Sequence, residues 1–584
     1  MPRVGADFLV RETDPADVFT PERLSEEHCL IERTAAEFIT NEVAPALPEM
    51  EKKNWAVARK LVARAGELGL IGVDTPEEYG GVGLDKAASV VVGGALGKCT
   101  SFSTTFGAQT GLAIIPILCF GTPEQKQKYL PRIVSGELVG AYCLSESGSG
   151  SDALSARARA TKQADGSWVL SGEKMWITNG GFADVFIVFA KVDGEQFSAF
   201  IVERSFSGVT NGKEEHKMGL HGSSTTPVLL QDARVPAENL LGEVGRGHKI
   251  AFNVLNYGRF KLAAMCTGGA RGTVGEAARY ALSRRQFGQP IASFGAIQHK
   301  IAEMTLRLYA AESALYRTTG LIDGAIGGSH EAATVLAALE EFALEASLLK
   351  VMSSEMVDFV VDENVQIHGG NGFVADYPAE RRYRDSRVNR IFEGTNEINR
   401  LLMPGILMKR GLKGQVPLVA TAKAVRDELM SVAPPEIVTS TGVLDAEQRI
   451  VAALRKTVII AVGLAMETYG DRLQHEQEAL MALSDLIIET FAAESAVLRA
   501  RQAAMTGAMA SLHADAATVI AHDSGLRAEI IARTLLGSML EGDAQRTALA
   551  GLRRVLKVPP ANTIAARRRI AEAVLSKRAY VFSE

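Results

Sequence analysis

The feature that most constrains the fold is one central stretch of strand-type sequence in a chain whose remaining pattern is helical. Short β-branched and aromatic runs occupy residues 168–170, 185–189, 200–202 and 228–230, all between about 140 and 245. Turn signals at Asp165-Gly166 and Asp193-Gly194 separate them. This spacing predicts a small antiparallel sheet or barrel, enclosed in sequence by helical segments.

The flanking segments carry helix signals. Thr20-Pro21 and Thr122-Pro123 each place a capping residue before a proline, which predicts helix starts at both positions. Across residues 342–360 apolar side chains recur at helical spacing, and Gly369-Gly370 ends that run. The residues at this spacing are Leu344, Leu348, Val351 or Met352, Met356, and Phe359 or Val360.

The last third of the chain forms a separate helical segment. Residues 411–440 contain Gly414, Pro417, Pro434 and Pro435 and are typical of a linker with some helix inside. From about 444 to 584 the sequence is Ala-rich, with an apolar face formed by Val451, Leu454, Val458 and Val462. We therefore expect a mainly α protein with a central β-domain, in four units: an N-terminal helical domain at 20–138, a middle β-domain at 139–246, a second helical bundle at 247–410, and a C-terminal helical extension at 411–584.

Composition limits the partners and the compartment. The 584 residues are 47% apolar and carry a net charge of −5, so nucleic acid or an anionic membrane is not the expected main partner. The five cysteines are scattered without a C-x-x-C pair, which indicates reduced thiols. The N-terminus has no secretory pattern, and the longest apolar run, residues 457–466, is about half of a membrane span. We expect a soluble, cytoplasmic protein, and leave open peripheral attachment to the inner face of a membrane.

Five short motifs occur in a fixed order, and only their combination is informative. A run such as SGSGSD alone is more often a loop than a cofactor site. The motifs are YCLSESGSGSD at 142–152, KMWITNG at 174–180, RRQFG at 284–288, QIHGGNG at 366–372 and IFEGTN at 391–396. Over residues 20–410 the chain thereby resembles the acyl-CoA dehydrogenase family, and its tail resembles the extra helical domain of the very-long-chain branch. The resemblance implies a helical bundle, a β-domain and a second bundle, with FAD between the last two.

The resemblance also implies which residues hold FAD. Tyr142, Ser145, Gly150 and Ser151 would line one side of the isoalloxazine ring, and Trp176 and Thr178 the other. Arg284, Phe287, Gln298, Gln366 and Gly370 would hold the ADP part, largely of a neighbouring subunit's FAD, and Thr395 and Glu397 would complete the pocket. The residue types suit these roles: Gly150 admits a flat ring, the serines can donate hydrogen bonds to it, and Arg284 offers a fork of donors to a pyrophosphate. The alternative for the glycines is simple turn formation.

Glu393, within IFEGTN, is the predicted catalytic base. Removal of a proton α to a thioester needs a base aimed at that carbon and a site for the developing oxyanion. In the family the carbonyl oxygen is held by a flavin hydroxyl and by the main-chain N–H of this same Glu, and Ser151 and Gly394 would contact the substrate. Closing an acyl chain over the carboxylate should raise its pKa. The alternative is a capping Glu in a loop.

A second position bears on this assignment. Some family members carry the base on an earlier helix, just before an Arg, and here that stretch reads Asn256-Tyr257-Gly258-Arg259. Gly258 occupies the slot, so no carboxylate competes with Glu393. Arg259 resembles the family's CoA-contacting, pocket-rigidifying Arg; the alternative is an ion pair. Asn256 stands where some members have Asp, which leaves its predicted substrate contact open.

The acyl pocket is predicted near residues 100–116. Thr104 and Ala108, beside Gly107, are smaller than the polar groups of medium-chain members, which favours a deep apolar slot and long acyl chains. No metal site is expected: His368 has no partner ligands in the sequence and is interpreted as a satisfied polar group, and Cys143 as a packing residue.

The predicted reaction is FAD-dependent α,β-dehydrogenation of acyl-CoA to trans-2-enoyl-CoA in fatty acid β-oxidation, with electrons passed to an electron-transfer flavoprotein. A homodimer is favoured, because an added tail often covers the surface through which family tetramers pair. The alternatives are an acyl-CoA oxidase, a DNA-binding relative and a pseudo-enzyme. Basic clusters at Arg553, Arg554 and Lys557 and at residues 567–569 could mark a membrane-contacting face, a DNA-binding patch, a solvated face or a subunit contact.

Overall fold

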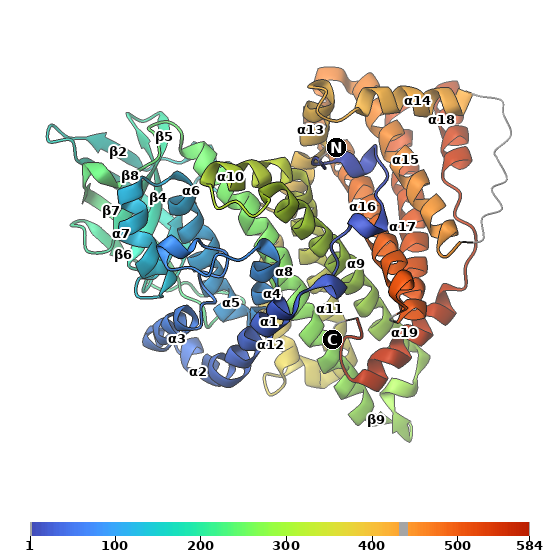
Figure 1. Ribbon diagram of the computed structural model, residues 1–584, viewed down its shortest axis with the longest axis horizontal. Helices are drawn as coiled ribbons and strands as arrows, with labels where there is room; N and C mark the ends of the chain where they lie inside the picture. The colour runs from blue at the N-terminus through green and yellow to red at the C-terminus, as the bar shows by residue number, and fades with distance from the viewer. Residues whose placement is uncertain (1–2, 431–441, 508, 583–584) are drawn as a thin grey trace.

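The computed structural model describes residues 3–430, 442–507 and 509–582 (Figure 1). The chain is mainly α-helical, with one sheet domain between helical regions and a further helical region at the C-terminal end, so the predicted fold class is confirmed. The N-terminal helices are α1 Glu26–Phe38, α2 Ala44–Glu51, α3 Trp55–Glu67, α4 Lys86–Leu96, α5 Thr100–Gly107, α6 Ile115–Phe120 and α7 Pro123–Val134. A π-helical segment, η6 Ala108–Ile114, joins α5 to α6.

One predicted helix start is confirmed and the other is wrong. The Thr122 side chain accepts a hydrogen bond from the main-chain N–H of Gln125, and the Gln125 side chain accepts one from the main-chain N–H of Thr122. Helix α7 therefore begins with a capping box. Pro21–Arg23 is only a 3₁₀ turn, and Thr20 makes no side-chain cap. Helix α1 begins instead after Ser25, which forms its own reciprocal cap with His28.

The middle strands are β1 Gly140–Cys143, β2 Arg159–Lys162, β3 Trp168–Thr178, β4 Val185–Val192, β5 Gln196–Glu203, β6 Val209–Asn211, β7 Thr225–Val235 and β8 Leu240–Leu241. Their order, β6-β7-β3-β2-β4-β5-β8, is open in the part of the chain that the structure describes, so the domain is a sheet rather than a closed barrel. The prediction of antiparallel pairing is only partly right, because β1 and β2 both pair with β4 in parallel. The chain between each of them and β4 is long enough for such a crossover.

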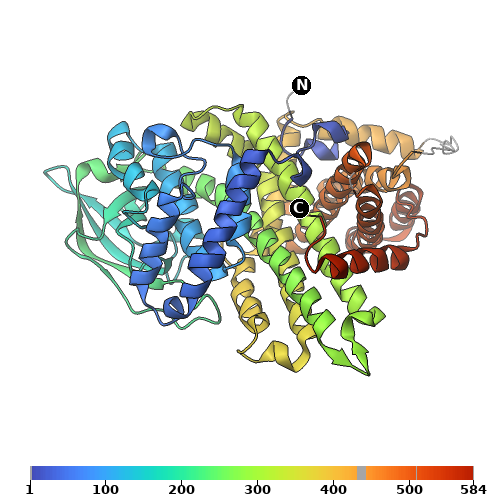
Figure 2. The same ribbon diagram turned by 60° about the horizontal axis from the view of Figure 1, so that its bottom comes forward.

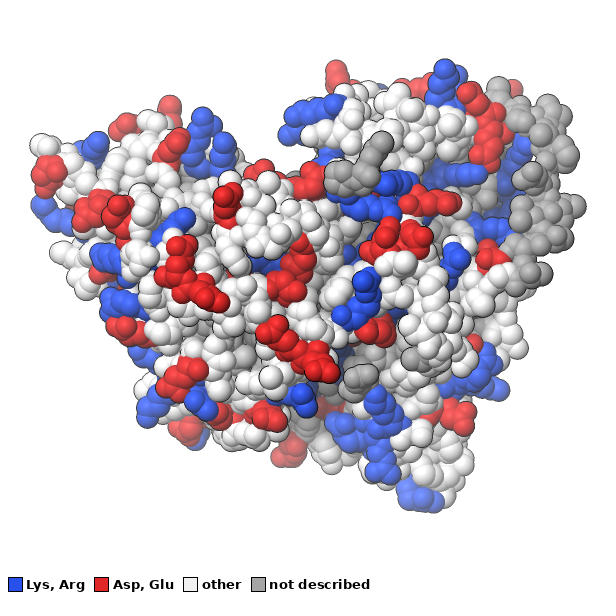
Figure 3. Space-filling model, viewed as in Figure 1, with Lys and Arg blue, Asp and Glu red and all other residues white. Residues whose placement is uncertain are grey.

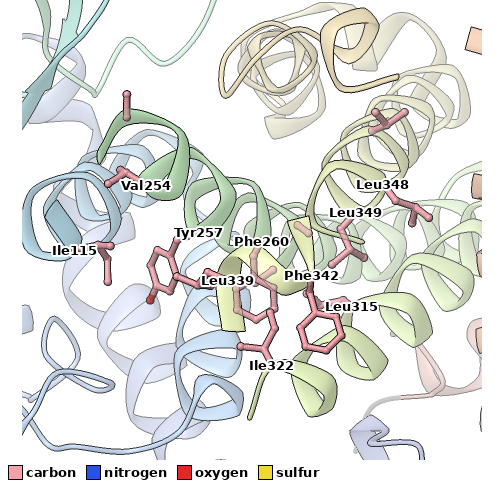
Figure 4. Close-up of a cluster of buried hydrophobic side chains, with 14 of the residues drawn as sticks. Ile115, Val254, Tyr257, Phe260, Leu315, Ile322, Leu339, Phe342, Leu348 and Leu349 are labelled. Carbon is pink, nitrogen blue, oxygen red and sulfur yellow. The ribbon is translucent and has the colours of Figure 1, made fainter. Parts of the chain in front are cut away.

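The second bundle consists of α8 Gly247–Ser283, α9 Gly295–Ile326, α10 Ala332–Glu341, α11 Ala343–His368, α12 Pro378–Ser386 and α13 Asn396–Leu412. A short hairpin, β9 Arg285–Gln286 and β10 Gln289–Pro290, joins α8 to α9. Aromatic and aliphatic side chains of α8, α9, α10 and α11 pack into one core (Figure 4). Gly369 ends α11 with a φ of 60°, as the glycine pair predicts.

The C-terminal region contains α14 Leu418–Met430, α15 Asp445–Tyr469, α16 Gln477–Thr506, α17 Ala510–Met539, α18 Gly542–Val555 and α19 Thr563–Lys577. The predicted apolar face of α15 is buried, and α14 supplies helix inside the expected linker. Pro434 and Pro435 lie outside the described residues. The N-terminal residues cross from α1 to these helices (Figure 2), where the rings of Phe8 and Phe491 are 4.7 Å apart.

Two of the basic residues singled out in the tail take part in ion pairs within the chain. Arg567 of α19 contacts Glu303 of α9 at 2.6 Å and Asp523 of α17 at 2.5 Å, and Arg569 contacts Asp515 at 2.5 Å. On the face shown in Figure 3, acidic and basic side chains are interspersed. One helical stretch, Thr100–Phe120, has the length and composition to cross a bilayer, but 83% of its apolar window is buried inside the fold, as in a core helix.

Candidate active site

The segment that carries Glu393 is a short loop held in an unusual backbone conformation. It lies between the 3₁₀ turn η11 Arg387–Arg390 and α13, and both Glu393 and Gly394 have positive φ, at 59° and 77°. Such a conformation is costly for a residue with a Cβ, so the surroundings must impose it. The Asn399 side-chain amide donates to the carbonyl oxygens of Gly394 at 2.8 Å and Thr395 at 3.0 Å, with a longer contact of 3.4 Å to Glu393.

Arg259 of α8 fixes the same loop from the other side. Its Nε donates to the main-chain oxygen of Glu393 at 3.1 Å, and its Nη1 donates to Asn256 Oδ1 at 3.1 Å. The side chain is buried, and burial lowers the pKa of Arg259 to about 10. Arg259 therefore has the geometry of a pocket-rigidifying residue rather than of a surface ion pair, and Asn256 orients it. Contact of either residue with a substrate stays a prediction.

Gly258 lies directly against the Glu393 carboxylate. A Cβ at Gly258 would lie 2.6 Å from Glu393 Oε2 and 2.9 Å from Cδ, both too close for a real contact. The absent side chain thus makes room for the carboxyl group that the sequence assigns to the reaction. Gly258 and Glu393, the two positions at which family members carry the base, therefore lie side by side.

The carboxyl group of Glu393 has a pKa close to neutral pH. Burial raises the pKa of Glu393 to about 7, although the charges of Arg259 and Lys350 act to lower it. Its Oε2 has no hydrogen-bond partner among the described residues, and the same holds for the nearby buried hydroxyl of Tyr142. Two unpartnered polar atoms in one buried place are typical of a site that completes its hydrogen bonds with a bound molecule.

Lys350 is a residue that the sequence reasoning did not identify. It lies on α11, its side chain is buried, and its Nζ donates to Asn396 Oδ1 at 2.7 Å. Burial lowers the pKa of Lys350 to about 8, and the charge of Glu393 opposes that change. One signal was available: Lys350 interrupts an apolar run on a helix face predicted to be buried.

A cavity of about 910 Å³, part of it open to solvent, leads away from Glu393. One wall is a stripe on α8 from Gly258 to Thr273, roughly 22 Å long at 1.5 Å per residue. The opposite wall comes from α5 and η6 and includes Thr104, Gly107 and Ala108, the residues expected there. Small side chains on this wall face larger apolar ones of α8, such as Leu262 and Met265, across a long slot that includes the carboxylate.

The residues assigned to the flavin ring lie near the same place. Thr178, at the end of β3, lines the cavity together with Glu393, and Trp176 is 59% exposed with a φ of 59°. A Cβ at Gly150 would have no described atom within 4 Å, so this backbone is open to a flat ligand. Ser145 is half-buried and Ser151 exposed on the same loop. The orphaned Tyr142 hydroxyl and the exposed indole fit a bound isoalloxazine.

A buried ion pair that the sequence did not indicate supports this loop. Lys174 Nζ contacts Glu146 Oε1 at 2.6 Å, and the main-chain N–H of Arg157 donates to Glu146 Oε2 at 2.6 Å. Glu146, though part of the SGSGSD segment, is thus a structural residue. Its carboxylate ties the two ends of the 146–157 loop to β3.

The residues assigned to the ADP part lie elsewhere in the chain. Arg284 ends α8 directly before the β9–β10 hairpin, and Phe287 lies in its turn; the hairpin projects at the bottom of Figure 1, away from the sheet domain. The Phe287 ring is 92% exposed, and Gly370 leaves open space where a Cβ would point. Gln298 and Gln366 flank the same end of the bundle, at the start of α9 and the end of α11. One chain does not bring the two halves together, as expected if the ADP part belongs to a neighbouring subunit's FAD.

The structure also describes the surroundings of the remaining residues, and the flavin contacts of Thr395 and Glu397 stay a prediction. Thr395 Oγ1 accepts from the main-chain N–H of Ile398 at 3.2 Å and caps α13, whereas Glu397 is exposed in its first turn. His368 Nδ1 lies 2.8 Å from the Asn364 carbonyl oxygen, and the His368 ring stacks on that of Tyr280. His368 is therefore a satisfied polar group. Cys143 is buried, which raises its thiol pKa to about 12. Within the described ranges no cluster of three or more His, Cys, Asp or Glu could hold a metal ion.

Comparison with known proteins covers nearly all of the chain. Profiles of the N-terminal, middle and C-terminal domains of acyl-CoA dehydrogenases match residues 25–137, 141–233 and 245–405, and another acyl-CoA dehydrogenase C-terminal profile matches 453–554. A probable acyl-CoA dehydrogenase of Bacillus subtilis is 45% identical over 99% of this chain and 98% of its own length. The chain belongs to the acyl-CoA dehydrogenase family. It is thus related to FAD-dependent oxidoreductases.

Two further relatives of this acyl-CoA dehydrogenase show how far the likeness extends. The crystal structure of an acyl-CoA dehydrogenase complexed with FAD from Bacillus anthracis superimposes with a TM-score of 0.97, at 45% identity, over 99% of this chain and 100% of that one. The human very long-chain specific enzyme is 42% identical over 61% of this chain and 53% of its own. The similarity to the two bacterial proteins therefore includes the C-terminal extension, whereas the match to the human enzyme spans 369 residues.

Proposed function

We propose that this chain oxidises acyl-CoA thioesters to trans-2-enoyl-CoA with bound FAD. One observation carries the proposal: the Glu393 carboxyl, with a pKa of about 7 and an unpartnered oxygen, lines a long slot whose α5 and η6 wall carries small residues. A base with a pKa near the working pH is the group that α-proton removal requires.

The residues divide the work of this reaction. FAD, when bound against Tyr142, Gly150, Trp176 and Thr178, supplies the acceptor for the β-hydride. Glu393 takes the α-proton onto its free Oε2. Its main-chain N–H holds the thioester oxygen, so that the base and the activated carbonyl are placed by one residue. Arg259 and Asn399 keep that residue in the left-handed conformation on which both contacts depend.

We propose long acyl chains as the preferred substrates. The slot extends roughly 22 Å along α8, and Gly107 and Ala108 place no bulky group across it. Each methylene buried in such a slot contributes about 0.8 kcal/mol, so chains that fill it are favoured over shorter ones.

The cellular setting follows from the same proposal. We propose a cytoplasmic homodimer that serves fatty acid β-oxidation and passes its electrons to an electron-transfer flavoprotein. The separation of the ring-binding residues from Arg284 and Phe287 supports an assembly in which each FAD lies between two subunits. The internal ion pairs of Arg567 and Arg569 weigh against a DNA-binding role for the tail.

The test is anaerobic mixing of FAD-loaded protein with straight-chain acyl-CoAs from short to very long, followed by flavin absorbance. We expect bleaching that is fastest with long chains and is reduced by a factor of about 10⁴ or more in Glu393→Gln, which keeps the shape but not the base. Absence of bleaching with every thioester, despite bound FAD, would exclude a dehydrogenase. Rapid peroxide formation in air would favour an oxidase.

A further inference from the structure

Arg400, in the first turns of α13, connects the loop of the base to the C-terminal extension. Its Nη1 and Nη2 donate to the two oxygens of Glu355 on α11, at 2.7 and 3.0 Å, and its Nε donates to Asp485 Oδ1 on α16 at 2.7 Å. The Arg400 side chain is only 13% exposed. Next to Asp485, Ser484 Oγ donates to the main-chain oxygen of Arg400 at 2.5 Å. Two consecutive residues of α16 thus contact the same residue of α13.

Glu355 also connects Arg400 to residues near Glu393. Glu355 Oε1 also accepts from Asn396 Nδ2 at 3.0 Å, and Asn396 Oδ1 accepts from the buried ammonium of Lys350 at 2.7 Å. Asn396 is the first residue of α13, and Asn399, in the same turn, holds the carbonyl oxygens of the catalytic loop. Hydrogen bonds therefore run without interruption from Asp485 through Arg400, Glu355 and Asn396 to Lys350.

We propose that Asp485 of the C-terminal extension is a positioning residue for the base Glu393, acting through Arg400 and the first turn of α13. This inference rests on the proposed function of Glu393. It assigns the extension a part in the active-site framework, because one anchor of the catalytic turn comes from α16.

Loss of the Asp485 contact should change both the position of the Glu393 side chain and the charge around it. Without Asp485, the guanidinium of Arg400 is held by Glu355 alone, and the turn that carries Asn396 and Asn399 loses its charged contact with α16. Asn396 then holds Lys350 less firmly, and the loop of Glu393 gains freedom. The charged or titratable groups that face Glu393 are Arg259 of α8, Lys350 of α11 and Tyr142 of β1, so movement of Lys350 changes the titration of the base.

The experiment compares Asp485→Ala with Asp485→Asn and with the matched control Glu489→Gln. Glu489 lies one helical turn further along α16 and loses an ion pair of the same kind, with Arg527 at 2.7 Å, that has no link to α13. Holoenzymes are mixed anaerobically with a saturated long-chain acyl-CoA across a pH series. We expect Asp485→Ala to reduce the flavin about 10-fold more slowly with KM within about 2-fold, since misplaced groups act on the chemical step. The acid limb of its pH profile should shift to higher pH.

The conservative variant and a second readout keep the outcomes distinct. Asp485→Asn retains an acceptor for Arg400 and should recover the rate to within about 3-fold, while Glu489→Gln should match the parent protein. Hydrogen exchange of peptide 391–401 should be faster in Asp485→Ala than in Glu489→Gln, whether or not the protein turns over acyl-CoA. Equal exchange in the two variants, or an unchanged rate and pH profile in Asp485→Ala, would overturn the inference. Failure of the parent protein to bleach would instead refute the proposed function.

Discussion

At the scale of single residues, the neighbours of Glu393 leave one of its carboxylate oxygens buried and without a hydrogen-bond partner among the described residues. Gly258 yields space, Arg259 holds the backbone without donating to the carboxylate, and Lys350 donates to Asn396 instead. The raised pKa follows from this arrangement, because burial disfavours the charged form and no hydrogen bond from the described part of the chain to Oε2 offsets it.

The pH dependence of the reaction is therefore predictable in sign. As the proposed base, Glu393 must be deprotonated to act, and burial raises its pKa to about 7, so the rate of flavin reduction should rise with pH through that value. Arg259, Lys350 and Tyr142 face the group, and the two cations lower its pKa. Lys350→Met should move the midpoint to higher pH in stopped-flow measurements. A midpoint near 4.5 in the parent protein would indicate a solvated carboxylate.

Gly258→Ala tests the contact between α8 and the base. The added Cβ would lie 2.6 Å from Glu393 Oε2, so the carboxylate must move, and we expect flavin reduction to slow by about 100-fold. FAD content and melting temperature should change little. The control is Gly463→Ala on α15, where a Cβ meets no described atom within 4 Å. Equal rates in the two variants would show that the carboxylate is free to move aside.

At the scale of elements, the substrate slot depends on how α5 and η6 face α8. Ala108→Leu should block the slot beyond Gly107, because the larger side chain occupies space that a long acyl chain needs. We expect kcat/KM for long-chain substrates to fall by about 10-fold or more, with short-chain substrates as the internal control. A uniform loss at every chain length would place Ala108 outside the path of the acyl chain.

Sequence alone predicted the elements better than their ends and contacts. Helical spacing located α11 and α15, and the Thr122-Pro123 cap signal located the start of α7, because those signals are local. The Thr20 signal failed, since Ser25 caps α1 more completely. The parallel pairing of β1 with β4 and the approach of Gly258 to Glu393 depend on contacts between distant segments, to which no local pattern corresponds.

At the scale of the whole molecule, charged residues hold the chain ends against the bundle. Arg499 of α16 is buried and contacts Glu22 near the N-terminus at 2.6 Å and Glu312 of α9 at 2.8 Å. Neither Arg499 nor Glu312 exposes its side chain to solvent. The pairing joins the N-terminal segment, the second bundle and the C-terminal extension at one point.

Removal of that arginine should be costly. Arg499→Met leaves Glu312 with Arg271 as its remaining cation, and we expect a loss of about 3 kcal/mol in the free energy of unfolding by urea denaturation. Arg546→Ala breaks a pair whose side chains are 75% and 92% exposed and should cost less than about 0.5 kcal/mol. Comparable losses in the two variants would show that the buried network adds nothing.

The crossing of the N-terminal segment onto α16 has a consequence for biosynthesis. Glu22 and Arg499 are separated by 477 positions, so a segment that is made early packs against one that is made much later. At about 5–20 residues per second, Glu22 waits roughly 25 to 95 s for its partner to be made. During that interval the segment around Glu22 must avoid non-native contacts. A chaperone that binds nascent chains could protect it by binding there.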